Sequence, residues 1–98
     1  MQMYIEGYSI NISYNSNYID PEILDRILKC KNSLIKFLKD CGIKINKGSI
    51  HEDGSYSIVT GYMPEILKKY ILNFYEKDPS ITISFTTLLT DDSGEDDE

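Results

Sequence analysis

The sequence predicts an α+β domain whose elements follow the order strand, helix, strand, strand, helix, strand. Two observations support this class: apolar residues alternate near both ends of the chain, and two segments carry apolar residues at three- and four-residue spacing. A chain of 98 residues can bury one core of this kind without disulfides or a structural metal. We expect one domain over residues 1–90 and a disordered acidic tail over residues 91–98.

The first predicted strand covers residues 4–14, and the first predicted helix follows a polar loop. Alternate residues of the strand form one apolar face, which Glu6 interrupts: Tyr4, Tyr8, Ile10, Ile12 and Tyr14. Asp20 and Pro21 are typical of a helix start, because aspartate caps the first turn and proline suits the first helical position. The helical spacing of apolar residues continues to Cys41, and Gly42 is expected to end the helix.

The rest of the domain is predicted to form a hairpin, a second helix and a last strand. Residues 43–52 and 55–60 flank Asp53 and Gly54, the preferred pair for a two-residue type I′ turn. Pro64 opens a predicted helix that runs to about residue 77 and has an expected core stripe of Ile66, Leu67, Tyr70, Ile71 and Phe74. Residues 80–90 alternate again and form the last predicted strand.

This order of elements fits a ferredoxin-like plait (β-α-β-β-α-β), with two helices on one face of a four-stranded antiparallel sheet in the order 4-1-3-2. One end of the sheet would gather the polar loops near residues 14–19, 51–55 and 77–80. The other end would place the start of the tail beside Lys39, Lys44 and Lys47. The last strand would be an edge without charge or proline, so pairing with a second copy or another partner is expected through residues 80–90.

The net charge of −6 belongs to the tail. Six of the 16 acidic residues occupy the last eight positions, and the other ten match the ten basic residues in number. Residues 26–47 hold seven of those basic residues and only one acid, Asp40, so the neutral body has a basic middle. The net charge of −6 is therefore weak evidence against nucleic-acid binding, because the body of the protein is neutral and has a basic middle.

No residue pattern predicts catalysis, a cofactor or a metal. Cys30 and Cys41 lie on one predicted helix, about 16 Å apart along its axis, which is too far for a disulfide, and we expect both to be buried thiols. A single histidine without a CxxC pair does not predict a zinc site. His51, Glu52 and Asp53 could serve a metal-dependent enzyme, but a polar hairpin tip accounts for them more simply. We expect a protein that is not an enzyme.

The first functional hypothesis is a small, non-catalytic inhibitor that binds a basic, nucleic-acid-acting protein such as a nuclease, its acidic groups mimicking phosphates. An immunity protein or a phage anti-defence protein of the anti-CRISPR kind would have this size, charge and lack of catalytic residues. Tyrosine mixed with asparagine and serine is the composition of adaptable binding loops. The expected partner-binding residues are Tyr14, Asn15, Asn17, Tyr18, Glu52, Asp53, Asp78, Asp91, Asp92, Glu95, Asp96, Asp97 and Glu98.

The alternative hypothesis is a nucleic-acid-binding protein whose acidic tail folds back as a competitor. Its expected binding residues come from the basic middle: Lys29, Lys36, Lys39, Lys44 and Lys47. Lys31 differs, because it lies within the apolar arc of the helix and is expected to extend along the edge of the core or to face a partner. An RNA-recognition motif is not predicted, because the open sheet face would carry small polar residues where that family places aromatic rings.

The composition also bears on origin and compartment. The chain is rich in Ile, Lys, Tyr and Asn and lacks Ala, which favours an AT-rich genome such as that of a low-GC bacterium or a phage. No apolar run approaches the roughly 18 residues of a membrane span, and the polar start does not resemble a signal peptide. We expect no membrane association and a place in the bacterial cytoplasm.

Overall fold

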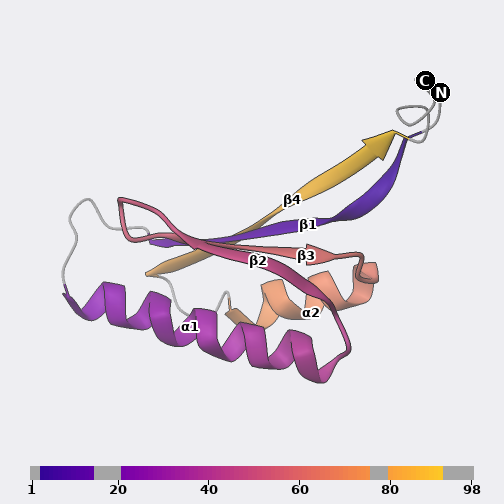
Figure 1. The fold of residues 1–98 in the computed structure, drawn as a ribbon. Coiled ribbons are helices and arrows are strands. Elements are labelled where there is room, and N and C mark those ends of the chain that lie inside the picture. The colour runs from indigo at the N-terminus through magenta and orange to yellow at the C-terminus, as the bar shows by residue number, and fades with distance from the viewer. Residues whose placement is uncertain (1–2, 15–20, 76–79, 92–98) are drawn as a thin grey trace.

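The computed structural model describes residues 3–14, 21–75 and 80–91, which form an α+β domain (Figure 1). Its elements are β1 (Met3–Tyr14), α1 (Pro21–Asp40), β2 (Ile45–Ile50), β3 (Tyr56–Gly61), α2 (Glu65–Tyr75) and β4 (Ile81–Asp91). The predicted order of strands and helices is confirmed, with element boundaries that differ by at most two residues from the expected ones.

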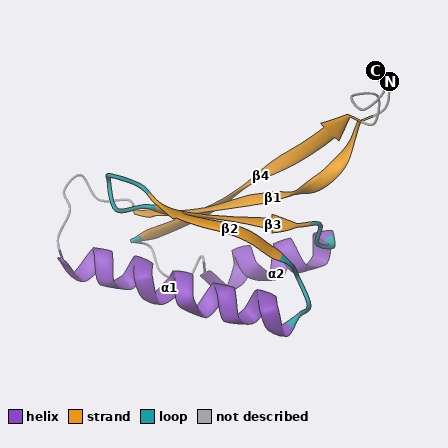
Figure 2. Cartoon of the chain, viewed as in Figure 1, coloured by secondary structure: helices purple, strands orange, loops and turns teal. Residues whose placement is uncertain are grey.

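The four strands form one antiparallel sheet in the order β2-β3-β1-β4, which reads 4-1-3-2 from the β4 edge. Both helices lie on the same face of this sheet and leave its other face open (Figure 2). β1 occupies a central position and pairs with β3 on one side and with β4 along its whole length on the other. The sheet therefore has two edge strands, β2 and β4.

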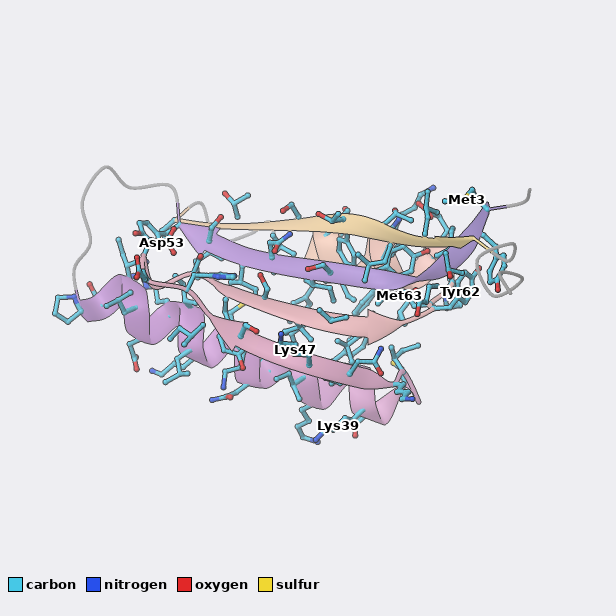
Figure 3. The ribbon with its side chains drawn as sticks, turned by 45° about the horizontal axis from the view of Figure 1, so that its top comes forward. Met3, Lys39, Lys47, Asp53, Tyr62 and Met63 are labelled. Atoms are coloured by element: carbon cyan, nitrogen blue, oxygen red, sulfur yellow. The ribbon has the colours of Figure 1, made fainter. Side chains whose placement is uncertain are left out.

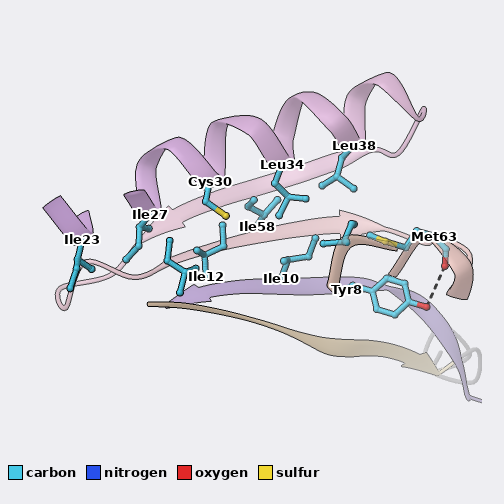
Figure 4. Close-up of a cluster of buried hydrophobic side chains, with 12 residues drawn as sticks. Tyr8, Ile10, Ile12, Ile23, Ile27, Cys30, Leu34, Leu38, Ile58 and Met63 are labelled. Carbon is cyan, nitrogen blue, oxygen red and sulfur yellow. Dashed lines mark hydrogen bonds between the residues drawn. The ribbon is translucent and has the colours of Figure 1, made fainter. Parts of the chain in front are cut away.

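The core lies between the sheet and the helices (Figure 4). Apolar side chains alternate along β1 toward the helices, while α1 supplies one buried residue every three or four positions, as an amphipathic helix does. Burying each such side chain contributes about 1.5–3 kcal/mol. The buried apolar residues are Tyr8, Ile10, Ile12, Ile23, Ile27, Cys30, Leu34, Leu38, Ile58, Met63, Ile71 and Ile81.

Gly42 ends α1 as predicted. Its φ of 79° lies in the left-handed region, where a residue with a Cβ is disfavoured. The N–H of Gly42 bonds to the carbonyl of Lys39 at 3.0 Å, and the N–H of Ile43 bonds to that of Leu38 at 2.9 Å. This pair of bonds satisfies carbonyl groups that the helix leaves open and turns the chain back toward β2.

The turn between β2 and β3 differs from the predicted type I′ turn. Gly54 has a positive φ of 90°, but Asp53 does not, although a type I′ turn needs positive φ at both central residues. The N–H of Gly54 bonds to the carbonyl of His51, and the N–H of His51 bonds to that of Ser55, both at 2.9 Å. These bonds enclose a three-residue loop with the left-handed glycine at its end. The glycine was identified correctly, but the loop is one residue longer than predicted.

A β-bulge near the start of β1 changes which residues face the core. The register with β4 shifts between Ile5 and Gly7, so Ile5 pairs with Leu89 and Tyr4 with Thr90. Because Tyr8 pairs with Thr87, the helix side of the strand before the bulge carries Ile5 and not Tyr4. The prediction that Tyr4 belongs to the core face is therefore wrong.

The core stripe predicted for α2 is only partly correct. Ile71 is fully buried and Leu67 is half-buried, but Ile66, Tyr70 and Phe74 are exposed by 77%, 52% and 50%. These three residues are spaced four apart and therefore lie along one side of the helix. The sheet accommodates only the side of α2 that contains Ile71, so the predicted stripe was too wide.

Candidate protein-binding surface

Two of the predicted partner-binding regions meet at one end of the sheet. The Tyr14 hydroxyl, at the end of β1, donates a 2.7 Å hydrogen bond to the backbone carbonyl of Asp53 in the β2–β3 loop. Glu52 and Asp53 are exposed at this tip, which lies far from Met3 and Tyr62 (Figure 3). The sequence correctly placed Tyr14 beside this loop.

Asp53 mainly organises its own loop. Its Oδ1 accepts hydrogen bonds from the Ser55 hydroxyl at 2.6 Å and from the Ser55 backbone N–H at 3.0 Å. These bonds, with a smaller contribution from His51, hold the pKa of Asp53 below its usual value. The carboxylate is therefore ionised across the physiological pH range and fixed by local bonds.

Most of the remaining predicted partner-binding residues lie outside the described residues. The backbone of Asp91 ends β4, opposite Met3. The predicted partner-binding residues outside the described ranges are Asn15, Asn17, Tyr18, Asp78, Asp92, Glu95, Asp96, Asp97 and Glu98.

A chain of hydrogen bonds crosses the open face of the sheet from β3 to β4. The Ser57 hydroxyl donates to Asn11 Oδ1 at 2.7 Å, and Asn11 Nδ2 donates to the Thr86 hydroxyl at 3.4 Å. His51 Nε2 lies 2.7 Å from the Ser57 oxygen. With the Ser57 proton directed to Asn11, the contact with His51 corresponds to the tautomer protonated at Nε2. These contacts join the end of β2, β3, β1 and β4 across the open face.

Between the ends of β3, the open face carries mainly small polar side chains. Residues that pair across neighbouring strands share a face, so the register with the buried residues identifies those that point away from the helices. On β1, β3 and β4 they include Ser9, Asn11, Ser13, Ser57, Val59, Thr82, Ser84 and Thr86. No aromatic ring is among these residues, so this part of the face does not offer the stacking platform of an RNA-recognition motif. Tyr4 lies on the same side of β1 but beyond the end of β3.

The structure does not bring the five lysines of the alternative hypothesis onto one surface. Lys29 pairs with Asp25 at 3.1 Å, and Lys36 pairs with Asp40 at 3.2 Å, both on α1. Lys39 follows on the last turn of α1, and Lys44 precedes β2. Lys47 pairs with Val59, which places it on the open face, away from the helix layer.

The arm, by which we mean residues 3–6 of β1 and 88–91 of β4, groups several exposed apolar side chains of the sheet. It continues beyond Gly7, which pairs with the last residue of β3, Gly61. Figure 1 shows this two-stranded ribbon extending past the helices. Its exposed apolar residues are Met3 (51%), Tyr4 (53%), Ile5 (40%) and Leu89 (55%).

The arm places the start of the acidic segment beyond the end of β3. Asp91, where the acidic segment begins, pairs with Met3 at the far end of the arm. This pair lies three residues beyond Leu88 on β4, which is level with Gly61, a distance of about 10 Å. The backbone of Asp91 therefore lies beyond the level of Gly61 and Lys44, because the β1–β4 pairing continues past the end of β3. The rest of the predicted tail, residues 92–98, lies outside the described residues.

Two further apolar surfaces lie on the helix side of the domain. In the first, the Phe37 and Tyr70 rings stack at 5.2 Å and the Tyr70 and Phe74 rings at 6.1 Å, along the seam between α1 and α2. The second is a cavity of about 220 Å³ lined by Leu24, Ile27, Leu28, Ile50, Gly54 and Tyr56. The Lys31 ammonium lies 5.0 Å from the centre of the Tyr56 ring beside this cavity, so the prediction that Lys31 extends along the edge of the core is confirmed.

The cysteines form no disulfide, as predicted, but only one of them is buried. Cys30 faces the core from α1, whereas Cys41 follows the helix end and is exposed. The expectation that both are buried was wrong, because α1 ends at Asp40 and Cys41 falls in the turn to β2. Among the described residues, no group of three or more His, Cys, Asp or Glu side chains is placed to hold a metal ion.

The arm was missed in the sequence, although a signal for it was present. Met3, Tyr4 and Ile5 are consecutive apolar residues, and consecutive residues of a strand point to opposite faces. At least one of them therefore had to point away from a one-sided core. A similar pair, Leu88 and Leu89, occurs on the strand that pairs with them.

No protein-family model, no curated protein and no solved structure matches this chain. Neither helix within the described ranges 21–75 is long and apolar enough to cross a membrane.

Proposed function

We propose that this protein is a non-catalytic inhibitor that binds a basic, nucleic-acid-acting protein through the arm and the acidic segment that follows it. The observation that carries this proposal is the junction at Asp91. Here the four exposed apolar side chains of the arm adjoin the last eight residues of the chain, six of which are acidic. An apolar contact next to a negative charge suits a basic protein surface.

The two parts of this site would contribute differently to binding. The acidic residues would increase the rate of association with a cationic surface, an effect that weakens as salt rises. The arm would slow dissociation, since burying a half-exposed apolar side chain on a partner contributes about 1 kcal/mol. A nuclease or an effector that normally holds phosphates would present the required positive surface.

The proposal extends to the fold, which we assign to the ferredoxin-like plait. Its support is the antiparallel strand order β2-β3-β1-β4 together with two helices on one face. Within such a plait the first and last strands are neighbours, so an extension of both produces a single ribbon. An immunity or anti-CRISPR-like role is the biological setting that we propose for this inhibitor.

Affinity capture with matched variants tests the proposed function. The full chain, a chain ending at Thr90 and the variant Ile5→Ser/Leu89→Ser would each be immobilised and exposed to lysate of a low-GC bacterium at low salt. We expect the full chain to retain a basic nucleic-acid-binding protein that added DNA displaces. The truncated chain should lose this protein at low salt, and the arm variant should release it faster.

A matched control separates the arm from apolar exposure in general. Ile66→Ser changes a residue that is 77% exposed on α2, outside the arm, and should leave capture unchanged. Equal capture by the full chain, the truncated chain and the arm variant would contradict the proposal. A gel shift of DNA by the full chain itself, strengthened by removal of the tail, would support the nucleic-acid-binding alternative instead.

A further inference from the structure

The two edges of the sheet are built very differently. β2 has six residues, a register shift between Ile45 and Lys47, and a lysine at position 47, and Lys44 directly precedes it. Short length, bulges and lysines are the features that protect natural edge strands from pairing. β4 has eleven residues and neither a charge nor a proline from Ser80 to Thr90.

No strand of the described part of the chain lies on the outer side of β4. Within the described part of the chain, β4 pairs with β1 alone, in an unbroken register from Ile81 to Leu88. Thr82, Ser84, Thr86 and Thr87 are exposed along it. Its backbone donors and acceptors on the outer side therefore form a straight row, which another strand can extend.

The opposite charges at the two ends of β4 favour a second copy of β4 as the pairing strand, in the antiparallel direction. Asp91 and the acids after it follow one end of β4, whereas the Arg26 guanidinium stands at the other end, where its Nη1 donates a 3.0 Å hydrogen bond to the Ser80 hydroxyl. Two copies of β4 in parallel would bring both acidic segments together. Two antiparallel copies would bring each acidic segment to the other copy's Arg26.

We propose that β4 pairs antiparallel with β4 of a second copy of this chain, with Thr86 opposite Thr86 on the two-fold axis. In this register Ile81 lies opposite Asp91 of the second copy, so the Asp91 end of each β4 comes next to the Ser80 that Arg26 contacts in the other copy. The pairing joins two sheets into one of eight strands, with all four helices on one face, because residues opposite each other in a sheet share a face. In this dimer the two arms lie at opposite ends of the joined β4 strands, so dimer formation does not require the arm to bind an inhibited protein. The inference therefore does not depend on the proposed function.

Charge at the two-fold axis gives the main test. The full chain, of 11.3 kDa, should sediment as a dimer. Thr86→Lys and Thr86→Glu each place two like charges face to face and should weaken self-association by about tenfold or more. An equimolar mixture of the two variants should recover the dimer. Thr86→Val, which removes the same hydrogen bond to Asn11 without adding charge, should remain dimeric.

The direction of pairing has its own test. In the antiparallel arrangement a chain ending at Thr90 should dimerise less tightly at low salt, and Arg26→Gln should have little further effect in that truncated chain. A dimer that tightens on truncation would overturn the antiparallel direction. Ser49→Lys, on the opposite edge, should leave the dimer intact. A full chain that sediments as a monomer at concentrations up to about 1 mM would overturn the proposal as a whole.

Discussion

The hydroxyl of Tyr14 and the backbone carbonyl of Asp53, 39 positions apart in the sequence, are joined by a 2.7 Å hydrogen bond. This bond fixes the end of the central strand β1 to the loop between β2 and β3. The sequence already placed both residues at this end of the sheet, since the strand pattern and the turn glycine determine it. The bond itself depends on the exact length of the loop, which was predicted one residue too short.

We predict that Tyr14→Phe lowers the free energy of unfolding by about 0.5–1.5 kcal/mol, the usual contribution of one such hydrogen bond. Urea unfolding followed by circular dichroism measures the change. Tyr62→Phe is the matched control: Tyr62 is exposed, so its hydroxyl should contribute less than about 0.5 kcal/mol. Equal losses for the two variants would show that the Tyr14 hydroxyl has no special role.

Asp53 gives the protein a defined response to acid. Because the Ser55 hydrogen bonds hold its pKa below the ordinary value of 3.8, the folded chain binds this proton less tightly than the unfolded chain does. Its contribution to stability is therefore complete above pH 3.8 and is lost as the pH falls through the lower, folded-state pKa. We expect Asp53→Asn to flatten the fall in stability below about pH 4, measured by urea unfolding over a pH series.

Ser55→Ala should bring the pKa of Asp53 back toward its ordinary value, because it removes the shorter of the two hydrogen bonds. A carboxyl NMR titration of both proteins measures this. Glu52→Gln, in the same loop, removes a neighbouring charge without removing a bond to Ser55 and should change the titration of Asp53 less. An unchanged Asp53 titration in Ser55→Ala would disprove the assigned cause.

Gly7 permits the close approach of β1 and β3 beside the bulge. A Cβ at this position would collide with the Thr60 carbonyl oxygen, which is backbone and cannot rotate away. Gly7→Ala should therefore lower the free energy of unfolding by about 1–3 kcal/mol, as overpacking does. Gly61→Ala is its control on the paired strand, because a Cβ there meets only Lys44 Cβ at an ordinary 3.7 Å. Equal thermal unfolding of the two variants would contradict this role.

Gly42 isolates the effect of backbone conformation. A Cβ at this position meets no atom within 4 Å, but its φ of 79° disfavours any residue that has one. Gly42→Ala should destabilise the protein by about 1–2 kcal/mol through conformation alone. Gly42→Asn should cost less, because asparagine tolerates this region better. Thermal unfolding of the unchanged chain, Gly42→Ala and Gly42→Asn measures the difference. A Gly42→Ala variant as stable as the unchanged chain would contradict the proposed cost of the left-handed conformation.

Local sequence patterns predict the secondary-structure elements and much of the core, but not features that depend on how distant segments pack. Alternation, helical spacing and the Asp53–Gly54 turn pair predicted the strands and helices of the described residues. The periodic patterns also located the core residues Ile10, Ile12 and Leu34, because these positions face the core whatever the neighbouring strands do. The bulge at Ile5 and Gly7 could not be predicted, since it depends on how two distant strands align. The exposure of Ile66, Tyr70 and Phe74 likewise depends on how much of the helix the sheet can cover.

The β1–β4 ladder also has a consequence for how the chain folds. Met3 and Asp91 pair although nearly the whole sequence separates them, and their ladder is the longest in the sheet. Contacts of such high sequence separation close large loops and slow folding. Until that closure, β1 would be paired on only one side, with the residues of the arm unpaired altogether. The same ribbon that presents apolar side chains in the native protein is therefore expected to form late and to set the pace of folding.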